Sequence, residues 1–415
     1  MNIAILGLGS RGELYADIIS EREKGSKLVA VCDLKAEKCR YAVEKYGVAE
    51  DKVFQDENEF FTAGKLADIL VVSTMDHDHY RHTLAALNLG YDILLEKPIS
   101  PKEEECREII ETANRLGRQI AICHVLRYTP FYGEIKRLLE AGEIGKIMTV
   151  SATENVGWWH QAHSFVRGNW RNSKESSPMI LQKCCHDMDI IRWLVDSHCV
   201  SVSSFGGLTH FTKENQPEDA AARCVDCKYI NDCLYSAKKY YIDHWKEIGE
   251  PQNWPYDVIT NDRPYTEESL RKAIKESPWG RCVYACDNDV VDHQICNMTF
   301  ENGVIAQLNM VAFSEKNYRR IHIWGTKGEI IGDMDENWIE IIRFNEGTEK
   351  IDVGKISNDK FGHGGGDIVL VHDFIKACEG SGSVLSSATA SLESHLMSFS
   401  AEKSRLSGGK VIEIK

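Results

Sequence analysis

The chain has 415 residues, a length that suggests two domains, or a domain and a half with an insertion. Hydrophobic residues make up 43% of it, so a sizeable core is within reach, and the net charge of -14 argues against a nucleic-acid partner. This balance favours a cytoplasmic protein with a small-molecule partner. We expect no signal peptide, and no run approaches the roughly 20 apolar residues of a membrane span.

The first 125 residues alternate between strand and helix patterns. Apolar runs such as NIAILGLG, KLVAVCD, ADILVVST and YDILLEKP stand between stretches with helical spacing. Continuous apolar strands between amphipathic helices are typical of a parallel sheet that helices cover on both faces. Residues 1–125 are therefore predicted to form one α/β domain.

A glycine-rich loop, GLGSRG, follows the first predicted strand and opens a helix, the context that gives this pattern its meaning. Gly7 would allow a tight turn, Gly9 would let the backbone approach a pyrophosphate, and Gly12 would let helix and strand pack closely. Free amides at the helix start favour anions. The structural alternative is a plain glycine turn. The predicted cofactor-binding segment comprises Gly7, Leu8, Gly9, Ser10, Arg11 and Gly12.

Asp33 ends the second predicted strand, where dinucleotide-binding domains place a carboxylate on the adenosine ribose. A carboxylate there would repel a 2′-phosphate, so NAD is favoured over NADP. Together with the glycine loop, Asp33 makes residues 1–125 a predicted Rossmann domain.

The segment LLEKPIS places Glu96 and Lys97 at the carboxyl end of a buried strand, the edge where open α/β sheets bind ligands. A partly desolvated lysine near a nicotinamide cation would have its ammonium form disfavoured, as proton transfer near neutral pH requires. The alternative is a solvated loop lysine. We predict that Lys97 is catalytic.

Residues 126–415 follow another pattern. FYGEIKRLLEAGEIG predicts a helix, HQICNMTFENGVIAQLNMVAF a hairpin around Asn302 and Gly303, and RRIHIWGTKGEIIGDM a second hairpin. Two helical stretches and a last strand, KVIEIK, follow. We predict an α+β domain with a large, mainly antiparallel open sheet. Residues 212–286 lack clear periodicity and are interpreted as a cysteine-rich insertion.

Three stretches resemble the Gfo/Idh/MocA oxidoreductases: GLGSRG, VVSTMDHDHYRHTLAALNLGYDILLEKP and HVLRYTPFYGEIKRLLEAGEIGKI. The resemblance covers nearly the whole chain apart from the insertion. It implies hydride transfer between NAD(P) and a hydroxyl carbon of a sugar, inositol or related polyol, and a homo-oligomer (dimer or tetramer) built on the open sheet. It also implies a catalytic Lys97. The cofactor contacts that it implies are Ser73, Thr74, His79, Glu96 and Lys97, although Met75 stands where many members have proline.

The segment QKCCHDMD resembles the family's pattern D-x-x-x-H-x-x-D, in which a histidine and an aspartate face the nicotinamide. His186 aligns with that histidine and Asp189 with the later aspartate, whereas Gln182 replaces the earlier one. We predict that Lys183 and His186, three residues apart on one helical face, lie over the substrate hydroxyl, with His186 sharing acid/base work with Lys97. A helix-capping cluster is the alternative.

Further substrate contacts are predicted in three polar segments. ENVGWWHQAHSFVRGNWRN offers flat aromatic faces and cationic donors, and CDNDVVDHQ offers paired carboxylates. FGHGGGDIV contains three glycines, so its backbone could come close to a ligand. A packed aromatic patch, an exposed acidic turn and a flexible linker are the respective alternatives. The candidates are His163, Arg167, Trp170, Arg171, Asp287, Asp289, His293 and His363, together with Asp189.

Five cysteines gather in or near the insertion: Cys224, Cys227 and Cys233 in a C-x2-C-x5-C spacing, then Cys282 and Cys286. Four thiolates would suit a structural zinc ion, and an iron–sulfur cluster uses the same ligands. The spacing matches neither standard pattern well, and inert thiols are the alternative. We place zinc first, with the role of pinning an insertion that lacks a core of its own.

Three functions remain open on the sequence. The first is an NAD-dependent dehydrogenase of a sugar, glycoside, inositol or related polyol. The second is an NAD-dependent glycosidase that oxidises the sugar transiently and eliminates the aglycone, which needs a further base. Candidates for that base are Asp287, Asp289, Lys183 and His163. The third is a non-catalytic NAD-dependent sensor, against which the intact Lys97 and His186 argue.

Overall fold

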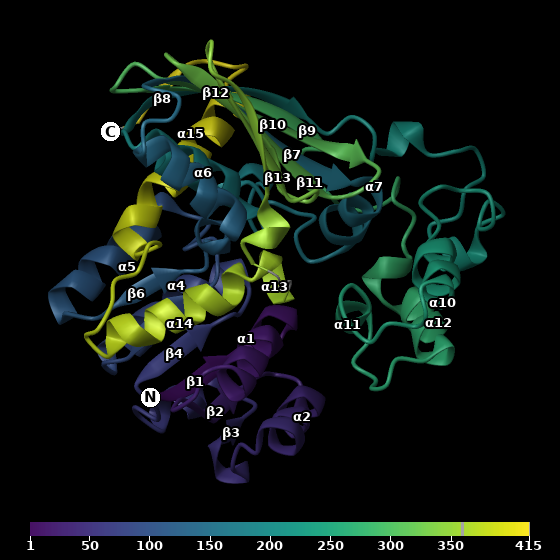
Figure 1. Cartoon of the computed structure of the whole chain (residues 1–415). Helices are drawn as coiled ribbons and strands as arrows, with labels where there is room; N and C mark the ends of the chain where they lie inside the picture. Colours follow the sequence, from purple (N-terminus) through teal and green to yellow (C-terminus); the bar gives the residue numbers. More distant parts are fainter. Residues whose placement is uncertain (358–360, 415) are drawn as a thin grey trace.

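The N-terminal domain contains a six-stranded, wholly parallel sheet with the order β3-β2-β1-β4-β5-β6. A computed structural model describes residues 1–357 and 361–414 (Figure 1). The strand order reverses between β1 and β4, and ligands of such sheets bind at that reversal, beyond the carboxyl ends of the strands. The strands are β1 Asn2–Leu6, β2 Lys27–Cys32, β3 Val53–Phe54, β4 Ile69–Val72, β5 Asp92–Leu95 and β6 Ile120–Ile122.

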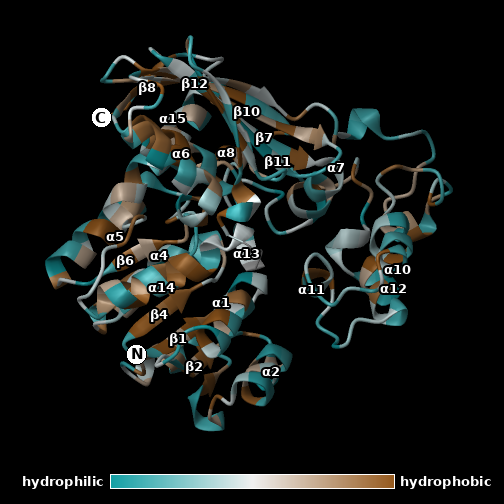
Figure 2. Cartoon of the chain, viewed as in Figure 1, coloured by the Kyte–Doolittle hydropathy of each residue, from teal (hydrophilic) through white to brown (hydrophobic). Residues whose placement is uncertain are grey.

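Helices cover both faces of this sheet, as the continuous apolar strands predicted. The four residues of β4 are all buried, and Figure 2 shows the strands of this domain as hydrophobic bands between helices with polar outer faces. The predicted α/β class with a parallel sheet is confirmed. The helices are α1 Ser10–Glu21, α2 Ala36–Tyr46, α3 Glu57–Thr62, α4 His79–Asn88 and α5 Glu103–Leu116.

One helix from the far end of the chain joins the N-terminal core. Helix α14 (Gly366–Cys378) buries Leu370, Val371 and Phe374 in the same cluster as Ile3 and Ile5 of β1. The division of the chain at residue 125 therefore remains a prediction about sequence segments, because the packed N-terminal unit also includes residues near the C-terminus.

The second domain contains a nine-stranded sheet with the order β14-β13-β12-β11-β7-β10-β9-β8-β15, in which β7 and β10 pair in parallel and the other neighbours antiparallel. The hairpins β9/β10 and β11/β12 confirm both predicted turns. The strands are β7 Ile147–Gly157, β8 Cys199–Gly207, β9 His293–Phe300, β10 Ile305–Ser314, β11 Tyr318–Gly325, β12 Gly328–Asp333, β13 Trp338–Arg343, β14 Gly347–Asp352 and β15 Ile412–Glu413.

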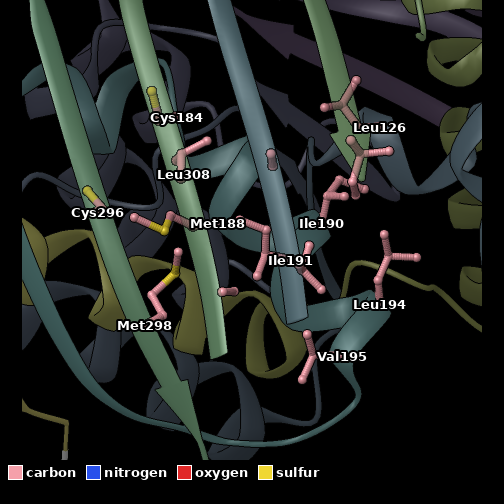
Figure 3. Close-up of a cluster of buried hydrophobic side chains, with 14 of the residues drawn as sticks. Leu126, Cys184, Met188, Ile190, Ile191, Leu194, Val195, Cys296, Met298 and Leu308 are labelled. Carbon is pink, nitrogen blue, oxygen red and sulfur yellow. The ribbon is translucent and has the colours of Figure 1, made fainter. Parts of the chain in front are cut away.

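Buried and exposed side chains alternate along the strands of this sheet, so one of its faces is buried. Every second residue of β9 is buried, and its Cys296 and Met298 pack with Leu308 of β10 against Met188 of a helix (Figure 3). The helices on that face are α6 (Pro130–Glu140), α9 (Cys185–Val195) and α15 (Ala388–Leu406). Since α9 carries the segment predicted to face substrate, the packing of this sheet fixes the position of that segment.

The insertion forms a lobe of short helices beside the two sheets, among them α10 (Trp245–Glu247), α11 (Tyr256–Ile259) and α12 (Glu267–Glu276) (Figure 1). The expectation that it lacks a core is wrong, because Trp245, Leu270 and their neighbours form a buried cluster of its own. The lobe also reaches the Rossmann domain. No helix in the described part of the chain is long and apolar enough to cross a membrane.

Candidate active site

The glycine-rich loop lies at the carboxyl end of β1, at the switch point of the sheet. Gly7 has φ +93°, and a Cβ there would lie 2.6 Å from the carbonyl oxygen of Ser73. A Cβ on Gly12 would lie 1.9 Å from the carbonyl oxygen of Gly7, whereas a Cβ on Gly9 would meet nothing within 4 Å. Gly7 and Gly12 are thus needed by the fold, and Gly9 leaves open space at the start of α1. That space and the uncapped N-terminus of α1 fit a pyrophosphate.

The carboxylate of Asp33 lies beside this loop. It accepts hydrogen bonds from the amide of Leu8 (2.7 Å) and the amide of Lys35 (2.9 Å). These bonds join the end of β2 to the glycine-rich loop and hold the carboxylate where an adenosine ribose would lie. The arrangement fits NAD, and each carboxylate oxygen retains a lone pair for a ribose hydroxyl.

Three predicted cofactor contacts also hold the neighbouring loops in place. The hydroxyl of Ser73 donates to the carbonyl of Gly7 (2.8 Å), and that of Thr74 bonds to His82 (3.0 Å). The ring of His79 is buried, with Nδ1 at 2.7 Å from the carbonyl oxygen of Pro98 and Nε2 at 3.2 Å from that of Thr74. The structure does not support a cofactor contact by the His79 ring, since its two nitrogens face carbonyl oxygens of the loops after β4 and β5.

Glu96 belongs to a buried ionic network rather than facing open space. Its Oε1 accepts from Arg11 Nε (2.6 Å) and from the Tyr15 hydroxyl (2.7 Å), and Arg11 also donates to Asp367 (2.5 Å). Burial would raise the pKa of Glu96, but the cations Arg11 and Lys97 lower it overall. The network fixes the start of α1 against the loop that carries Lys97.

Lys97, His186 and His363 gather beyond the carboxyl end of β5. Lys97 Nζ donates to the carbonyl oxygen of Gln182 (2.8 Å), the last residue of α8 (Met179–Gln182), and so spans the two domains. The rings of His186 and His363 are 6.2 Å apart, and Asp367 orients His363 through a 2.9 Å contact with Nδ1. The structure therefore brings these three predicted residues together.

His186 is a buried, neutral group with a free ring nitrogen. Burial lowers its pKa well below the ordinary value, and the nearby charge of Lys97 lowers it further. Its Nδ1 is enclosed and has no hydrogen-bond partner among the described residues. A buried polar atom of this kind is expected to meet a ligand, since leaving it unsatisfied costs about 1–3 kcal/mol.

The prediction that Lys183 and His186 lie on one continuous helical face is wrong. The helical path is interrupted between α8, which ends at Gln182, and α9, which begins at Cys185. At this point the amide of Cys184 donates to the carbonyl of Met179. Lys183 instead pairs with Glu154 of β7 (3.1 Å).

Glu154 and its neighbours form a second buried network that the sequence reading missed. Glu154 pairs with Arg319 of β11 (2.5 Å), which also contacts Asp187 of α9 (2.9 Å). Burial raises the pKa of Asp187 to about 6, although Arg319 opposes the shift. A glutamate at a position of β7 that the strand alternation buries is the sequence signal that could have found this network.

We expect the titration of Asp187 to lower kcat/KM on the acid side of the pH profile. Above pH 6 its carboxylate is charged and holds Arg319, and below pH 6 it becomes protonated and that contact weakens. kcat/KM should fall by up to roughly tenfold per pH unit as the pH is lowered through about 6, the slope of a single protonation. Asp187→Asn should have low activity with a flat profile in this range. An unchanged limb in that variant would show that another group titrates.

Asp189 is a structural residue. Its side chain is 1% exposed, and Arg127 donates to both carboxylate oxygens at 2.7 Å while His124 Nδ1 lies at 2.9 Å. Burial would raise the pKa of Asp189, but Arg127 and His124 lower it strongly overall. The structure does not support a substrate contact here, because Arg127 and His124 already occupy both carboxylate oxygens of Asp189.

Asp189→Asn should destabilise the protein by about 3–5 kcal/mol, because it leaves the Arg127 charge buried without its partner. Urea unfolding measures this effect, and Asp51→Asn, on an exposed aspartate, should stay within about 0.5 kcal/mol of wild type. The folded pKa of Asp189 is lowered, so its contribution is present above the ordinary value of 3.8 and is lost as the pH falls toward the folded value. A loss below 1 kcal/mol in Asp189→Asn would contradict this account.

Most other predicted substrate contacts have protein partners elsewhere. His163 is 2% exposed and bonds to the Tyr241 hydroxyl (2.7 Å), and Arg167 is 2% exposed at the base of the insertion. Trp170 packs against the core of the second domain. Arg171 and three further candidates form hydrogen bonds within the protein: Arg171 with Asp287, Asp289 with Ser173, and His293 with Asp292. The structure supports none of the paired residues as a substrate contact, because their polar atoms hold the loops at residues 161–177 and 281–293, whereas the buried Nε1 of Trp170 has no hydrogen-bond partner among the described residues.

An aromatic wall lies beside the two lysines, and it combines Trp159, from the segment predicted to offer flat aromatic faces, with residues that the sequence analysis did not single out. Burial lowers the pKa of His160, and the positive charges of Lys183 and Lys97 lower it further, which places both lysines near this ring. The ring of His160 stacks on Trp159 (5.6 Å between centroids) and meets Trp254 edge-on (5.0 Å), and Tyr240 also stacks on Trp159 (5.4 Å). Trp254 and Tyr240 come from the insertion, so this lobe contributes to the substrate side of the site.

The five cysteines of the insertion are free of disulfides, and the zinc prediction is not supported as made. Within residues 1–357 and 361–414, no three histidine, cysteine, aspartate or glutamate side chains lie close enough to hold one metal ion. Cys286 donates to the carbonyl oxygen of Cys282 (3.2 Å), which accounts for one of the five thiols.

A Rossmann domain, a lysine at the end of β5 and a free histidine nitrogen opposite define an NAD-binding oxidoreductase. Two family models agree: the oxidoreductase family, NAD-binding Rossmann fold, matches residues 1–124, and the oxidoreductase family, C-terminal alpha/beta domain, matches residues 136–398. The chain belongs to the Gfo/Idh/MocA oxidoreductase family.

Several proteins from this comparison are similar over long segments. The oxidoreductase YteT of Bacillus subtilis is 22% identical over 399 residues, which cover 90% of this chain and 88% of YteT. Inositol 2-dehydrogenase of Azotobacter vinelandii is 26% identical over 245 residues, 57% of this chain and 68% of that enzyme. An Agrobacterium radiobacter oxidoreductase, solved with NAD+, L-tartaric acid and magnesium, has a TM-score of 0.70 at 13% identity, over 100% of this chain and 98% of the other. That last likeness concerns the fold.

Proposed function

We propose that this protein is an NAD-dependent dehydrogenase that transfers hydride between nicotinamide and a hydroxyl carbon of a sugar, inositol or related polyol. The observation that carries the proposal is the buried His186 ring near Lys97, beyond the carboxyl end of β5, with its Nδ1 unpartnered among the described residues. Bound NAD supplies the hydride acceptor. The glycine-rich loop and Asp33 would hold it.

Lys97 and His186 would handle the proton of the substrate hydroxyl. Lys97 is oriented by the Gln182 carbonyl, and His186 is neutral, so its Nδ1 can accept a hydrogen bond from a hydroxyl or donate one to it. His363 lies next to His186 and is held by Asp367. The two histidines would bind neighbouring hydroxyls and so fix which carbon faces the nicotinamide.

The shape and chemistry of the surrounding residues support a carbohydrate-like substrate. Lys183, paired with the buried Glu154, offers a charged donor for hydroxyls, and the aromatic wall of Trp159, Trp254 and Tyr240 offers apolar faces for C–H groups. The similarity to inositol 2-dehydrogenases over part of the chain points in the same direction.

The test is a panel of sugars, inositols and aryl glycosides incubated with the protein and NAD, with NADH absorbance and aglycone release followed together. NADH that accumulates with one polyol supports the dehydrogenase. Aglycone release without net NADH would show a redox glycosidase, the second function. That alternative has lost two of its candidate bases, because Asp287 and Asp289 are tied to Arg171 and Ser173. NAD binding with neither reaction across the panel would favour a sensor.

We also propose that the outer face of the nine-stranded sheet mediates homo-oligomerisation. Phe205 and Ile295 are cross-strand neighbours there, 60% and 42% exposed, and Ile305 and Met148 add further exposed apolar area. Such a patch on an otherwise charged protein is typical of a subunit interface. Light scattering of wild type against Phe205→Lys tests this: the proposal expects a dimer or tetramer that dissociates in the variant.

A further inference from the structure

We infer that Cys224, Cys227, Cys233 and Cys282 hold a four-iron, four-sulfur cluster in the insertion. The inference is independent of the proposed function. It replaces the single zinc ion expected from the sequence, and it selects four of the five cysteines.

Four thiols from three separate segments line one cavity. Cys224 and Cys227 flank a short helical turn, Cys233 follows it, and Cys282 reaches the same cavity from after α12. Cys224 is buried, the other three are half-buried, and Cys286 is absent from the lining because its thiol is turned to a backbone carbonyl. The approach of Cys282 to Cys224, 58 residues earlier in the chain, is produced by the fold and not by the local C-x2-C spacing.

The four thiols share one cavity, yet among the described residues no three of them lie close enough to hold one ion, a spacing that suits a cluster. A tetrahedral zinc ion lies about 2.3 Å from each of its sulfurs, so four thiols around it leave no solvent-sized space. The cavity, which Arg167, Tyr229 and Tyr235 also line, measures about 30 Å³, more than the roughly 10–15 Å³ that one water needs. A cubane cluster places an inorganic core between its four cysteine sulfurs and therefore keeps the ligands further apart. A cluster therefore agrees with the finding that, in residues 1–357 and 361–414, no three ligating side chains lie close enough to share a single ion.

A buried arginine beside the cavity provides a second, independent indication. Arg167 is 2% exposed, and its guanidinium donates to the carbonyls of Arg281 (2.7 Å) and Tyr235 (2.6 Å) and to Cys224 Sγ (3.6 Å). Among the described residues it has no carboxylate partner. A buried cation is expected to have an anionic partner, and a cluster ligated by four thiolates supplies one.

Two further donors point at the sulfurs. The amide of Ala237 lies 3.5 Å from Cys224 Sγ, and Gln216 Nε2 lies 3.8 Å from Cys282 Sγ. Hydrogen bonds to ligand sulfurs are among the means by which proteins stabilise and tune iron–sulfur clusters.

The cluster would act on the active site through structure, with no electron transfer. Arg167 ends the segment 161–167, which begins directly after His160 of the aromatic wall, and the insertion supplies Trp254 and Tyr240 to that wall. Losing the cluster should therefore impair the substrate side of the site more than the Rossmann domain.

The test is metal and sulfide analysis of the full-length protein, purified without oxygen or reconstituted anaerobically with ferrous iron and sulfide. We expect about four irons and four acid-labile sulfides per chain, with a broad visible absorption that dithionite bleaches. One zinc per chain without sulfide would overturn the inference in favour of the mononuclear site. No retained metal after reconstitution, with four thiols free to react in the folded protein, would overturn it in favour of inert cysteines.

Cys227→Ser and Cys282→Ser identify the ligands, with Cys286→Ser as the matched control outside the cavity lining. The first two should retain less than half of the wild-type iron, and Cys286→Ser should retain all of it. Circular dichroism and NAD binding by the Rossmann domain show whether each variant folds. Equal iron loss in Cys286→Ser would overturn the assignment of the four ligands, and the wild-type sulfide analysis decides the cluster even if a variant fails to fold.

Discussion

Lys97→Met is expected to lower kcat by about 10²–10⁴-fold, the range for removal of a group that transfers the proton in the transition state. The variant keeps the length and most of the apolar stem of the lysine, and it removes the ammonium that donates to the Gln182 carbonyl. NAD binding should remain within a few-fold of wild type, because the glycine-rich loop and Asp33 are untouched. Steady-state rates with the polyol found in the panel, and NAD titration by fluorescence, measure the two effects separately.

Two companion variants make the result specific to proton transfer. Lys102→Met removes an exposed lysine that forms a surface pair with Glu105, and it should leave the rate unchanged. Lys97→Arg keeps a positive charge but cannot release a proton near neutral pH, so it should not restore activity. If Lys97→Arg were nearly as active as wild type, Lys97 would contribute charge only and the proposed proton role would be wrong.

Gly12→Ala should abolish NAD binding and destabilise the fold, the second large effect. Its Cβ would lie 1.9 Å from the backbone oxygen of Gly7, an atom of the loop itself, so α1 and β1 would have to move apart. Overpacking of this kind costs typically about 1–3 kcal/mol, and more where backbone is involved. Thermal unfolding and NAD titration together measure the loss.

Gly9→Ala separates cofactor binding from folding. Its Cβ meets nothing within 4 Å in the protein, so stability should change by less than about 1 kcal/mol, whereas the methyl group would occupy space that a pyrophosphate needs. We expect at least a tenfold loss of NAD affinity. Gly133→Ala, at an equally open position within α6, should change neither property except for a small gain in stability. Unaltered NAD affinity in Gly9→Ala would show that the dinucleotide does not cross this loop.

The cofactor half of the site could be predicted from the sequence because it is encoded locally. A strand, a glycine turn and a helix within residues 2–21 fix the phosphate loop, and Lys97 follows directly from the end of β5. The alternation of β9 and β10 around Asn302 and Gly303 likewise determines their hairpin, since a period of two allows one register with a buried face.

The substrate half could not be predicted in the same way. Lys183, Glu154, Arg319 and Asp187 come from segments up to about 165 residues apart, and nothing in their local sequence shows that they meet. The break between α8 and α9 changes the direction of Lys183, and the rotation of α9 turns Asp189 inward to Arg127. A one-residue change in helical phase moves a side chain by about 100° around the axis, so a motif alone cannot decide which acid faces the substrate.

The sequence by itself determined the class of this protein: a parallel α/β domain with a dinucleotide loop and a lysine at its ligand edge, followed by a mainly antiparallel sheet. Only the tertiary structure decided the partners of the charged residues, the return of α14 to the N-terminal core, and which four thiols share a cavity. It also brought Asp257 of the insertion to the Ser10 hydroxyl (2.5 Å) and Arg263 to Glu13 (2.6 Å) across the dinucleotide loop. The physical reason is that backbone periodicity is set by neighbouring residues, whereas a buried polar group takes its partner from whatever long-range packing brings within reach.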